Sequence, residues 1–513
     1  MRSLFLTLLV GTCCLSFAGA TDAQIEQASW LDGWQPTSLA RQALTQLADA
    51  DQDGLDPDRY DASELAVLYD QLVSGPQADP VLAMAFEERL TKAMTTYLNH
   101  LALGRVAPHE VQARFDGAAG RSFDAALALQ QAMQADDLEL AVTAARPNFV
   151  LYGALRNVLQ HYQALGHHPA WDQSLPIPST RVLTNPQPYV GLSTLVSRLQ
   201  VLGDLGALTE QPEIYDDALE QAIRSFQYRH GLTVDGIVGP QTLAALDVSP
   251  MQRAGQIALA MERLRWTPLQ RSDRLIVVNV PGFMLYAYEV DTQGQVELSL
   301  EMRVVVGRAT NHRTPIFDQD MLFIEFSPYW NIPYSIARRE TIPSLRRDPD
   351  YLARQGLEFV DMNGQVSTDL TEEMLQAVLQ GQWRIRQRPG DQNALGTVKF
   401  IFPNQQNIFL HHTPTSHLFD CERRDFSAGC VRVSEPFELA KFVLQGDAQW
   451  PDERIWQAMN AGQSQTIRLE RPIPVVIGYS TVMVRDGTVY FYPDIYGHDV
   501  RLAQALSKQR AKP

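Results

Sequence analysis

Leu275-Ile276-Val277-Val278-Asn279-Val280 is an apolar run rich in β-branched residues, and it marks where this 513-residue chain changes from helical to strand-like sequence. Two similar runs follow at Met284-Leu285-Tyr286-Ala287-Tyr288 and at Met302-Arg303-Val304-Val305-Val306-Gly307, bounded by Pro, Gly and Asp residues. Such runs are typical of β-strands. Asp291-Thr292-Gln293-Gly294, between the second and third runs, predicts a turn within a meander. We therefore predict a mostly β domain from about residue 274 to residue 480.

One segment of this β domain, residues 335–387, does not follow the strand pattern. It is charged, and Glu372-Glu373-Met374-Leu375-Gln376-Ala377-Val378-Leu379 has the spacing of a helix. An excursion of about fifty residues that leaves and rejoins a β core is typical of a lid or binding loop. The segment is therefore predicted to be a capping insertion.

Upstream of the β domain, the pattern is helical from about Gln24 to about Leu183, with apolar residues three and four positions apart. Met251 to Trp266 forms another amphipathic stretch, which we expect to pack back on this helical region. Residues 49–54 (Asp-Ala-Asp-Gln-Asp-Gly) resemble the start of a calcium loop, but the twelfth position is Tyr60, where a bidentate Glu is required. The sequence favours a helix end with Gly54 as its C-cap.

Length and charge limit the classes of function. A chain of this length needs more than one core, and its formal net charge of -16 argues against a nucleic-acid partner. The first twenty residues have the charged, apolar and small-residue regions of a secretory signal peptide, with cleavage expected after Ala20. We therefore expect an exported, soluble mature protein from which Cys13 and Cys14 have been removed.

Of the four cysteines, Cys430 has the most informative surroundings: it lies nineteen positions after His411 and follows Ser427-Ala428-Gly429. A thiol with an ordinary pKa of about 8.5 needs a base such as an imidazole to become a good nucleophile at neutral pH. The small residues leave room for the backbone N–H groups of Ala428 and Gly429 to contact an oxyanion. This pattern indicates acyl transfer through a thioester. Two alternatives stay open, a buried structural cysteine and a disulfide between Cys421 and Cys430; we favour a mainly free Cys430 thiol that Cys421 can trap reversibly under oxidation.

Residues 186–250 have a different texture, with Phe226-Gln227, Gly231-Leu232 and Val234-Asp235-Gly236-Ile237-Val238-Gly239 at characteristic spacing. This region resembles the small three-helix peptidoglycan-binding module, whose Asp-Gly-X-X-Gly turn needs positive φ angles. The alternative is a helical insert that no longer binds glycan.

The residues around the Cys/His pair also resemble a known family. His411, Thr413-Pro414 and residues 427–433 (Ser-Ala-Gly-Cys-Val-Arg-Val) are similar to the signature of the L,D-transpeptidases, and are most similar to their large periplasmic branch. Many members carry a second histidine two residues before the cysteine, where this chain has Ala428, so His411 is the one base expected.

The resemblance implies a multidomain α+β fold and roles for further residues. Its domains are a signal peptide (1–20), a helical scaffold domain (21–185), the peptidoglycan-binding-like module (186–250), a connecting helix packed on the scaffold (251–273), a mostly β catalytic sandwich (274–480) with its helical capping insertion, and a C-terminal strand and helix extension (481–513). Cys430 is the implied nucleophile, His411 the general base and acid, and the backbone carbonyl of His412 the group that orients His411. The implied substrate contacts are Tyr329, Trp330, Asn393, Thr413 and Arg432, although Trp330 fits a core position better and Arg432 fits a role in fixing its own loop equally well. The side chains of His412 and His417 are expected to be surface loop groups.

The implied activity is the formation of 3–3 cross-links between tetrapeptide stems of peptidoglycan, with release of D-Ala. An L,D-carboxypeptidase, an enzyme that couples a protein to the wall, and a non-catalytic wall-binding scaffold remain alternatives. The implied partners are peptidoglycan stems and glycan, penicillin-binding proteins or other wall synthases, and carbapenems as covalent inhibitors. Neither a metal nor a cofactor is expected.

Overall fold

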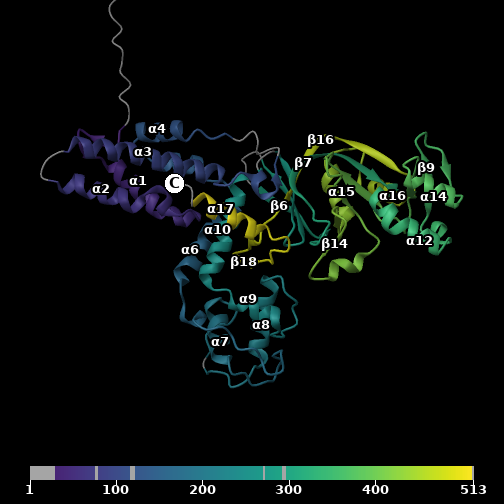
Figure 1. Cartoon of the computed structure of the whole chain (residues 1–513), viewed down its shortest axis with the longest axis horizontal. Helices are drawn as coiled ribbons and strands as arrows, with labels where there is room; N and C mark the ends of the chain where they lie inside the picture. Colours follow the sequence, from purple (N-terminus) through teal and green to yellow (C-terminus); the bar gives the residue numbers. More distant parts are fainter. Residues whose placement is uncertain are drawn as a thin grey trace, which may run out of the picture.

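The structure is a computed structural model that describes residues 29–75, 79–115, 122–208, 210–269, 272–291 and 296–510. The predicted signal peptide, with Cys13 and Cys14, and most of the predicted turn at Asp291–Gly294 lie outside these residues. Figure 1 shows a helical domain at one end of the long axis, a β domain at the other, and a small helical module projecting from the middle. No described helix is both long and apolar enough to cross a membrane.

The N-terminal helices share one apolar core, which includes Trp30, Leu65, Phe86 and Leu98. Polar caps begin several of them: the Thr37 hydroxyl accepts a hydrogen bond from the Ala40 N–H, and the Asp79 carboxylate accepts from two amides of the next helix. The helices are α1 (Ser38–Ala48), α2 (Ala62–Ser74), α3 (Pro80–Leu103), α4 (Ala125–Gln134), α5 (Glu139–Ala145) and α6 (Val150–Leu165), and a two-stranded ribbon, β1 (Leu31–Asp32) with β2 (Gln35–Pro36), precedes them.

The acidic turn after α1 is structural, as the sequence favours. A 3₁₀ helix, η1 (Asp49–Asp53), ends at Gly54, whose φ of 69° is in the left-handed region. The buried Asp53 carboxylate forms ion pairs with Arg146 (3.4 Å) and Arg156 (3.5 Å) instead of facing an open loop. A Cβ on Gly54 would lie 2.9 Å from the Cβ of Ala258, so the turn is also the point where the helical domain meets α10 (Pro250–Trp266).

The module contains α7 (Leu192–Val201), α8 (Asp217–Arg229) and α9 (Pro240–Asp247) around its own core. The predicted glycine turn is confirmed at Gly236, which has a φ of 72°, donates its N–H to Gln227 and accepts from the Tyr215 hydroxyl at 2.6 Å. It is wrong for Gly239, whose φ of -90° does not require glycine. The chain then returns through α10, which packs against α6 as expected. One edge of the module touches the β domain, where the Glu422 carboxylate accepts from the Val234 N–H at 3.1 Å and from the Thr233 hydroxyl.

The β domain is built on one mixed sheet whose strands run in the order β12-β13-β15-β6-β5-β4-β16-β7-β3, with β14 paired to β6. Because β12 also pairs with β7, the strands predicted as a sandwich form a closed hydrogen-bonded circuit. The three predicted strands are confirmed as β4, β5 and the end of β6. The strand bounds are β3 (Ala113–Arg114), β4 (Arg274–Asn279), β5 (Met284–Val290), β6 (Val296–Gly307), β7 (Ile316–Phe326), β12 (Val398–Ile401), β13 (Leu410–His411), β14 (Asp425–Ser427), β15 (Val431–Val433) and β16 (Gln465–Gly478), and the helices α15 (Pro436–Leu444) and α16 (Asp452–Asn460) follow β15.

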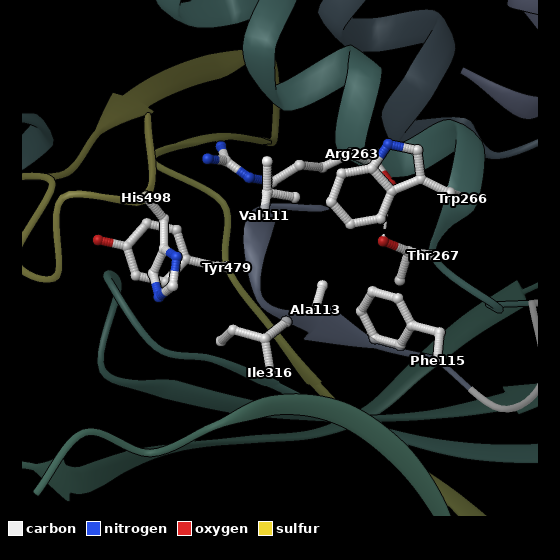
Figure 2. Close-up of a pocket in the computed structure, with 9 residues that line it drawn as sticks. All are labelled: Val111, Ala113, Phe115, Arg263, Trp266, Thr267, Ile316, Tyr479 and His498. Atoms are coloured by element: carbon white, nitrogen blue, oxygen red, sulfur yellow. Dashed lines mark hydrogen bonds between the residues drawn. The ribbon is translucent and has the colours of Figure 1, made fainter. Parts of the chain in front are cut away.

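Strand β3 comes from the helical domain, and sequence patterning did not reveal it. It is two residues long and pairs in parallel with β7 through Ala113 and Ile316. Behind it, Val111, Phe115 and Trp266 line a small, partly open space of about 10 Å³, room for a single water molecule (Figure 2). The helical domain is therefore joined to the sheet by backbone hydrogen bonds as well as by side-chain packing.

The predicted capping insertion forms a small domain with its own core, which includes Ile342, Leu345, Phe359 and Ile385. The predicted helix is confirmed as α14 (Glu372–Leu379). The other elements are β8 (Trp330–Asn331), α11 (Tyr334–Ile336), the π-helical turn η5 (Ala337–Thr341), α12 (Ile342–Arg347), α13 (Tyr351–Arg354), β9 (Leu357–Asp361), β10 (Val366–Ser367) and β11 (Trp383–Gln387), of which the four strands form a separate sheet.

The C-terminal extension consists of a hairpin, β17 (Val482–Arg485) with β18 (Thr488–Phe491), and a helix, α17 (His498–Arg510). The hairpin packs on α6 and α10, and the His230 ring of the module stacks between Phe226 and Phe491. The extension therefore lies where the helical domain, the module and the β domain meet (Figure 1).

Candidate active site

Strand pairing brings His411 and Cys430 to one face of the sheet. Strands β13 and β15 are parallel, with Leu410 opposite Val431 and His411 opposite Arg432. Cys430 directly precedes β15. Because side chains alternate along a strand and directly opposed residues share a face, Cys430, Arg432 and His411 point to the same side.

The imidazole of His411 is held in one orientation. It is 4% exposed, and its Nδ1 lies 2.5 Å from the carbonyl oxygen of His412. A carbonyl oxygen only accepts hydrogen bonds, so this contact keeps the proton on Nδ1 and leaves Nε2 as the acceptor. Burial, and next the positive charge of Arg432, lower the pKa of His411 to about 3. The ring is therefore neutral at physiological pH, with Nε2 unprotonated.

The thiol of Cys430 is protonated at rest. Its S–H donates to the carbonyl oxygen of Asn407 at 3.6 Å, and burial raises its pKa to about 11. Among the described residues, no hydrogen bond joins the sulfur to His411. Thiol and imidazole are thus both neutral in the resting state, so proton transfer between them must accompany the engagement of substrate.

Asn407 is presented by a loop that sequence analysis did not single out. Asn404 shapes this loop: its amide nitrogen donates to the carbonyls of Phe402 and Ile408, both at 2.7 Å, and its oxygen accepts from the Ile408 N–H. Asn407 then adopts a φ of 53°, a conformation that asparagine tolerates better than most residues. Two asparagines three positions apart, Asn404 and Asn407, were the feature of the sequence that could have indicated this turn.

The turn before the nucleophile corrects one predicted contact. Gly429 has a φ of 121°, which favours glycine, and its N–H donates to the Ser427 hydroxyl oxygen at 3.0 Å. The same hydroxyl donates to the Cys430 carbonyl. The Gly429 amide is therefore already used and is not a free oxyanion donor. Ala428 is exposed beside it, and the N–H of Cys430 itself has no acceptor within the described part of the chain.

Two cations flank His411 in register. Lys399 of β12 lies opposite it on one side, and Arg432 of β15 lies opposite it on the other. The Lys399 ammonium lies 3.8 Å from a Glu325 oxygen and 4.3 Å from the centre of the Phe409 ring. Both cations disfavour an imidazolium at His411. Lys399 was missed because only strand register places it beside the histidine.

Arg432 and Thr413 are linked to one loop. Arg432 Nη1 donates to the Thr415 hydroxyl at 3.2 Å, and the buried Thr413 hydroxyl lies 2.8 Å from the same Thr415 oxygen. The Nε of Arg432 has no hydrogen-bond partner among the described residues. Arg432 therefore braces its loop and also has donor capacity left.

Three of the predicted substrate contacts belong to the border of the capping insertion. Asn393 is 1% exposed and fully engaged: its amide donates to the carbonyls of Pro328, Gln387 and Arg388, and its oxygen accepts from the Leu395 N–H. It is a structural brace, and the predicted substrate contact is wrong. Trp330 packs on the core of the insertion, and the Tyr329 ring lies under the Arg386 guanidinium at 4.1 Å.

Two further expectations have clear outcomes. Cys421 and Cys430 are both free thiols, as we favoured. The ring of His412, expected to be a surface group, is instead packed against the turn at Gly396, where its Nδ1 accepts from the Thr397 N–H at 3.2 Å. In the described residues, no group of three or more His, Cys, Asp and Glu is placed to hold a metal ion.

Comparison with known proteins assigns the region that holds this site. Residues 273–477 match the family model of the L,D-transpeptidase catalytic domain, which includes both His411 and Cys430. The chain carries an L,D-transpeptidase domain. Residues 23–159 match a model described as "Scaffold domain", and residues 191–246 match one described as "Putative peptidoglycan binding domain". Together these matches confirm the predicted combination of scaffold, module and L,D-transpeptidase domain.

Individual relatives are more distant. A Haemophilus influenzae protein named "Putative L,D-transpeptidase" is 30% identical over 244 residues, which cover 48% of this chain and 48% of that protein. The chain thus spans about half the length of the curated relative it matches. An L,D-transpeptidase from Xylanimonas cellulosilytica (residues 123–326) is 15% identical, covering 59% of this chain and 99% of that one, at a TM-score of 0.18. A Bdellovibrio bacteriovorus structure is also 15% identical, covering 47% and 56%, at a TM-score of 0.18.

Proposed function

We propose that this protein is a cysteine-dependent L,D-transpeptidase that forms 3–3 cross-links between tetrapeptide stems of peptidoglycan. The observation that carries the proposal is the placement of Cys430 and His411 on one face of the L,D-transpeptidase domain, with the His411 tautomer fixed by the His412 carbonyl. The peptidoglycan-binding module supports the same substrate class. Its turn at Val234 contacts Glu422, in the segment that joins the two reacting residues.

The first half-reaction forms a thioester. His411 Nε2 takes the Cys430 proton as the sulfur attacks the carbonyl carbon of the third stem residue. The resulting oxyanion collapses, the bond to the nitrogen of D-Ala breaks, and His411 returns the proton to the departing amine. Low imidazole basicity, caused by burial and the neighbouring cations, favours this return.

The second half-reaction consumes the thioester. The side-chain amine of a diamino acid in another stem attacks the thioester carbonyl and gives its proton to His411. An amide forms, and the sulfur leaves and regains the proton. The segment that follows the capping insertion packs at Gly396 against the His412 ring, next to His411. An insertion that keeps water from the thioester favours an amine acceptor.

One experiment distinguishes the candidate activities. Purified protein is incubated with disaccharide tetrapeptide, and the products are separated by chromatography. Cross-linked dimers with free D-Ala support the transpeptidase. Tripeptide without dimers indicates an L,D-carboxypeptidase, products seen only with an added protein acceptor indicate coupling to the wall, and unchanged substrate indicates a wall-binding scaffold. The Cys430→Ala variant is the matched control.

A thiol that accepts an acyl group also predicts inhibition. We propose that carbapenems acylate Cys430, with opening of the lactam ring and no leaving group. Intact-mass measurement should show one adduct on the wild-type protein and none on Cys430→Ala; an undiminished adduct on the variant contradicts the assignment. We further propose export to the periplasm and cooperation with penicillin-binding proteins or other wall synthases, which cell fractionation and co-purification test.

A further inference from the structure

The nucleophile turn is connected to a buried hydroxyl outside the catalytic motif. Thr314 is 1% exposed, and its side-chain oxygen donates to the Gly429 carbonyl at 2.8 Å. The same oxygen accepts the Gly307 N–H at 2.9 Å. Both hydrogen-bonding directions of this hydroxyl are thus used, one of them on the residue directly before Cys430.

Fixing the Gly429 carbonyl also fixes the amide of Cys430. The two groups belong to one peptide unit, and Asn185-Pro186 is the one cis bond among the described residues, so this unit is trans. In a trans peptide the C=O and N–H point in opposite directions. The Cys430 N–H therefore points away from Thr314, and it is the amide without an acceptor.

Two more contacts prevent this peptide from turning over. Ser427 holds the next carbonyl, that of Cys430, and occupies the Gly429 N–H. Only Cα, Cβ and the sulfur separate the Cys430 amide from an acyl carbon bonded to that sulfur, so rotation about these bonds can bring the acyl oxygen to the N–H. The free N–H is thereby preorganised for charge that develops during acylation.

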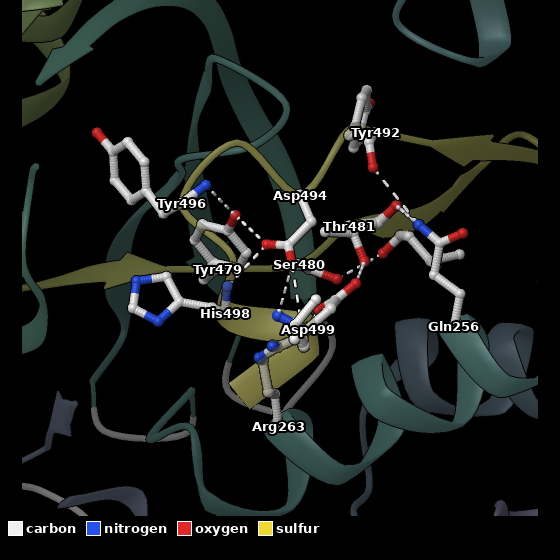
Figure 3. Close-up of polar contacts among 12 residues, drawn as sticks. Gln256, Arg263, Tyr479, Ser480, Thr481, Tyr492, Asp494, Tyr496, His498 and Asp499 are labelled. Carbon is white, nitrogen blue, oxygen red and sulfur yellow. Dashed lines mark hydrogen bonds and ion pairs between the residues drawn. The ribbon is translucent and has the colours of Figure 1, made fainter. Parts of the chain in front are cut away.

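The support for Thr314 extends into the C-terminal extension. The Tyr496 hydroxyl donates to the Gly307 carbonyl and accepts from the Thr314 N–H at 3.2 Å. Figure 3 shows how Tyr496 is held: its N–H donates to the Tyr479 hydroxyl at 2.9 Å, and that hydroxyl donates to Asp494. Asp494 in turn accepts the His498 N–H at the start of α17. A continuous hydrogen-bonded path thus leads from α17 to the nucleophile turn.

We propose that Thr314 is a positioning residue whose hydroxyl directs the Cys430 N–H toward the oxyanion, and that Tyr496 holds Thr314 in place. This inference rests on the proposed acyl transfer at Cys430. Thr314 touches neither substrate nor sulfur; it acts through the Gly429–Cys430 peptide.

The rates of acylation and of alkylation of Cys430, measured on the same variants, distinguish this positioning role from a general structural role of Thr314. Attack on a peptide thioester forms an oxyanion, and the leaving thiolate takes the proton that His411 has removed. Attack on iodoacetamide displaces iodide at a saturated carbon and forms no oxyanion. Both rates are measured on the full chain by peptide mass spectrometry of Cys430. Thr314→Val should slow acylation roughly 10- to 100-fold, since one oxyanion donor is worth about 10²–10³, and leave alkylation within about twofold.

The control variants keep the hydroxyl group at position 314 or remove it at position 496. Thr314→Ser keeps the hydroxyl and should restore acylation, and Tyr496→Phe should slow acylation less than Thr314→Val. Unchanged acylation in Thr314→Val, or equal slowing of both reactions, overturns the proposal. If Thr314→Val does not fold, Tyr496→Phe decides by the same comparison. Wild-type acylation by the thioester without any product from disaccharide tetrapeptide would reject the proposed function and leave this inference standing.

Discussion

The protonation state of Cys430 gives the most direct test of how this site works. With a pKa of about 11, the thiolate fraction at pH 7 is roughly 300-fold smaller than for a cysteine of ordinary pKa near 8.5. A more basic thiolate is a better nucleophile, with a Brønsted slope of about 0.4–0.5, which recovers roughly 10- to 20-fold of that loss. Cys430 should therefore react with iodoacetamide about 15- to 30-fold more slowly at pH 7 than a cysteine of ordinary pKa in an unstructured peptide.

The pH profile is the informative part of this assay. Because the thiol must lose its proton to bulk solvent, the alkylation rate of Cys430 should rise about tenfold per pH unit from pH 7 to pH 10. Peptide mass spectrometry after timed alkylation reads Cys430 separately from the other cysteines. His411→Ala should leave the profile nearly unchanged, since the resting thiol donates to Asn407. A plateau with a midpoint between pH 6 and 8, lost in His411→Ala, would reveal a resting thiolate–imidazolium pair and refute the neutral state.

Three further predictions follow from the same geometry. His411→Ala should lower the rate of cross-linking roughly 10²- to 10⁴-fold, nearly as much as Cys430→Ala, because no second histidine stands at Ala428; chromatography of the tetrapeptide reaction measures it, and activity above a tenth of wild type contradicts it. Asn393→Ala should lower the free energy of unfolding by about 2–3 kcal/mol, because it leaves backbone carbonyls without a donor, and it should not raise KM. A raised KM at wild-type stability would instead show that Asn393 contacts the substrate. The pKa of His411 is about 3 in the folded protein and about 6.5 in the unfolded chain, so the unfolded chain binds the proton first and the free energy of unfolding decreases as pH falls from about 6.5 to 3. Urea denaturation at several pH values should show a smaller decrease for His411→Gln than for wild type; an equal decrease in both refutes this.

Patterns that repeat along the chain were readable from the sequence. The strands β4, β5 and β6 and the helix α14 were predicted because β-branched runs and three-and-four spacing are local signals. The Cys430 and His411 pair was singled out because its motif is compact in sequence, and its catalytic role stays a prediction.

Features that depend on register or on distant partners were not readable. Lys399 lies beside His411 only because β12 pairs with β13, and β3 is a two-residue strand with no periodicity of its own. Asn393 was assigned to substrate because its segment resembles the border of the family's capping insertion, and that resemblance carries no information on burial. Its burial and four hydrogen bonds show that the same chemistry serves to tie the loop down.

The site combines a rigid frame with an uncharged resting pair, and this combination has a mechanistic consequence. Ser427, Thr314 and the His412 carbonyl fix the turn, the Cys430 amide and the imidazole before substrate arrives. Burial at the same time holds the thiol and the imidazole neutral. In the proposed reaction, charge therefore develops only during attack, when the Cys430 amide is already placed for the oxyanion and Nε2 of His411 is already placed for the proton. A site arranged this way has little thiolate to lose to oxidants, and the proposed mechanism confines its reactivity to a bound carbonyl.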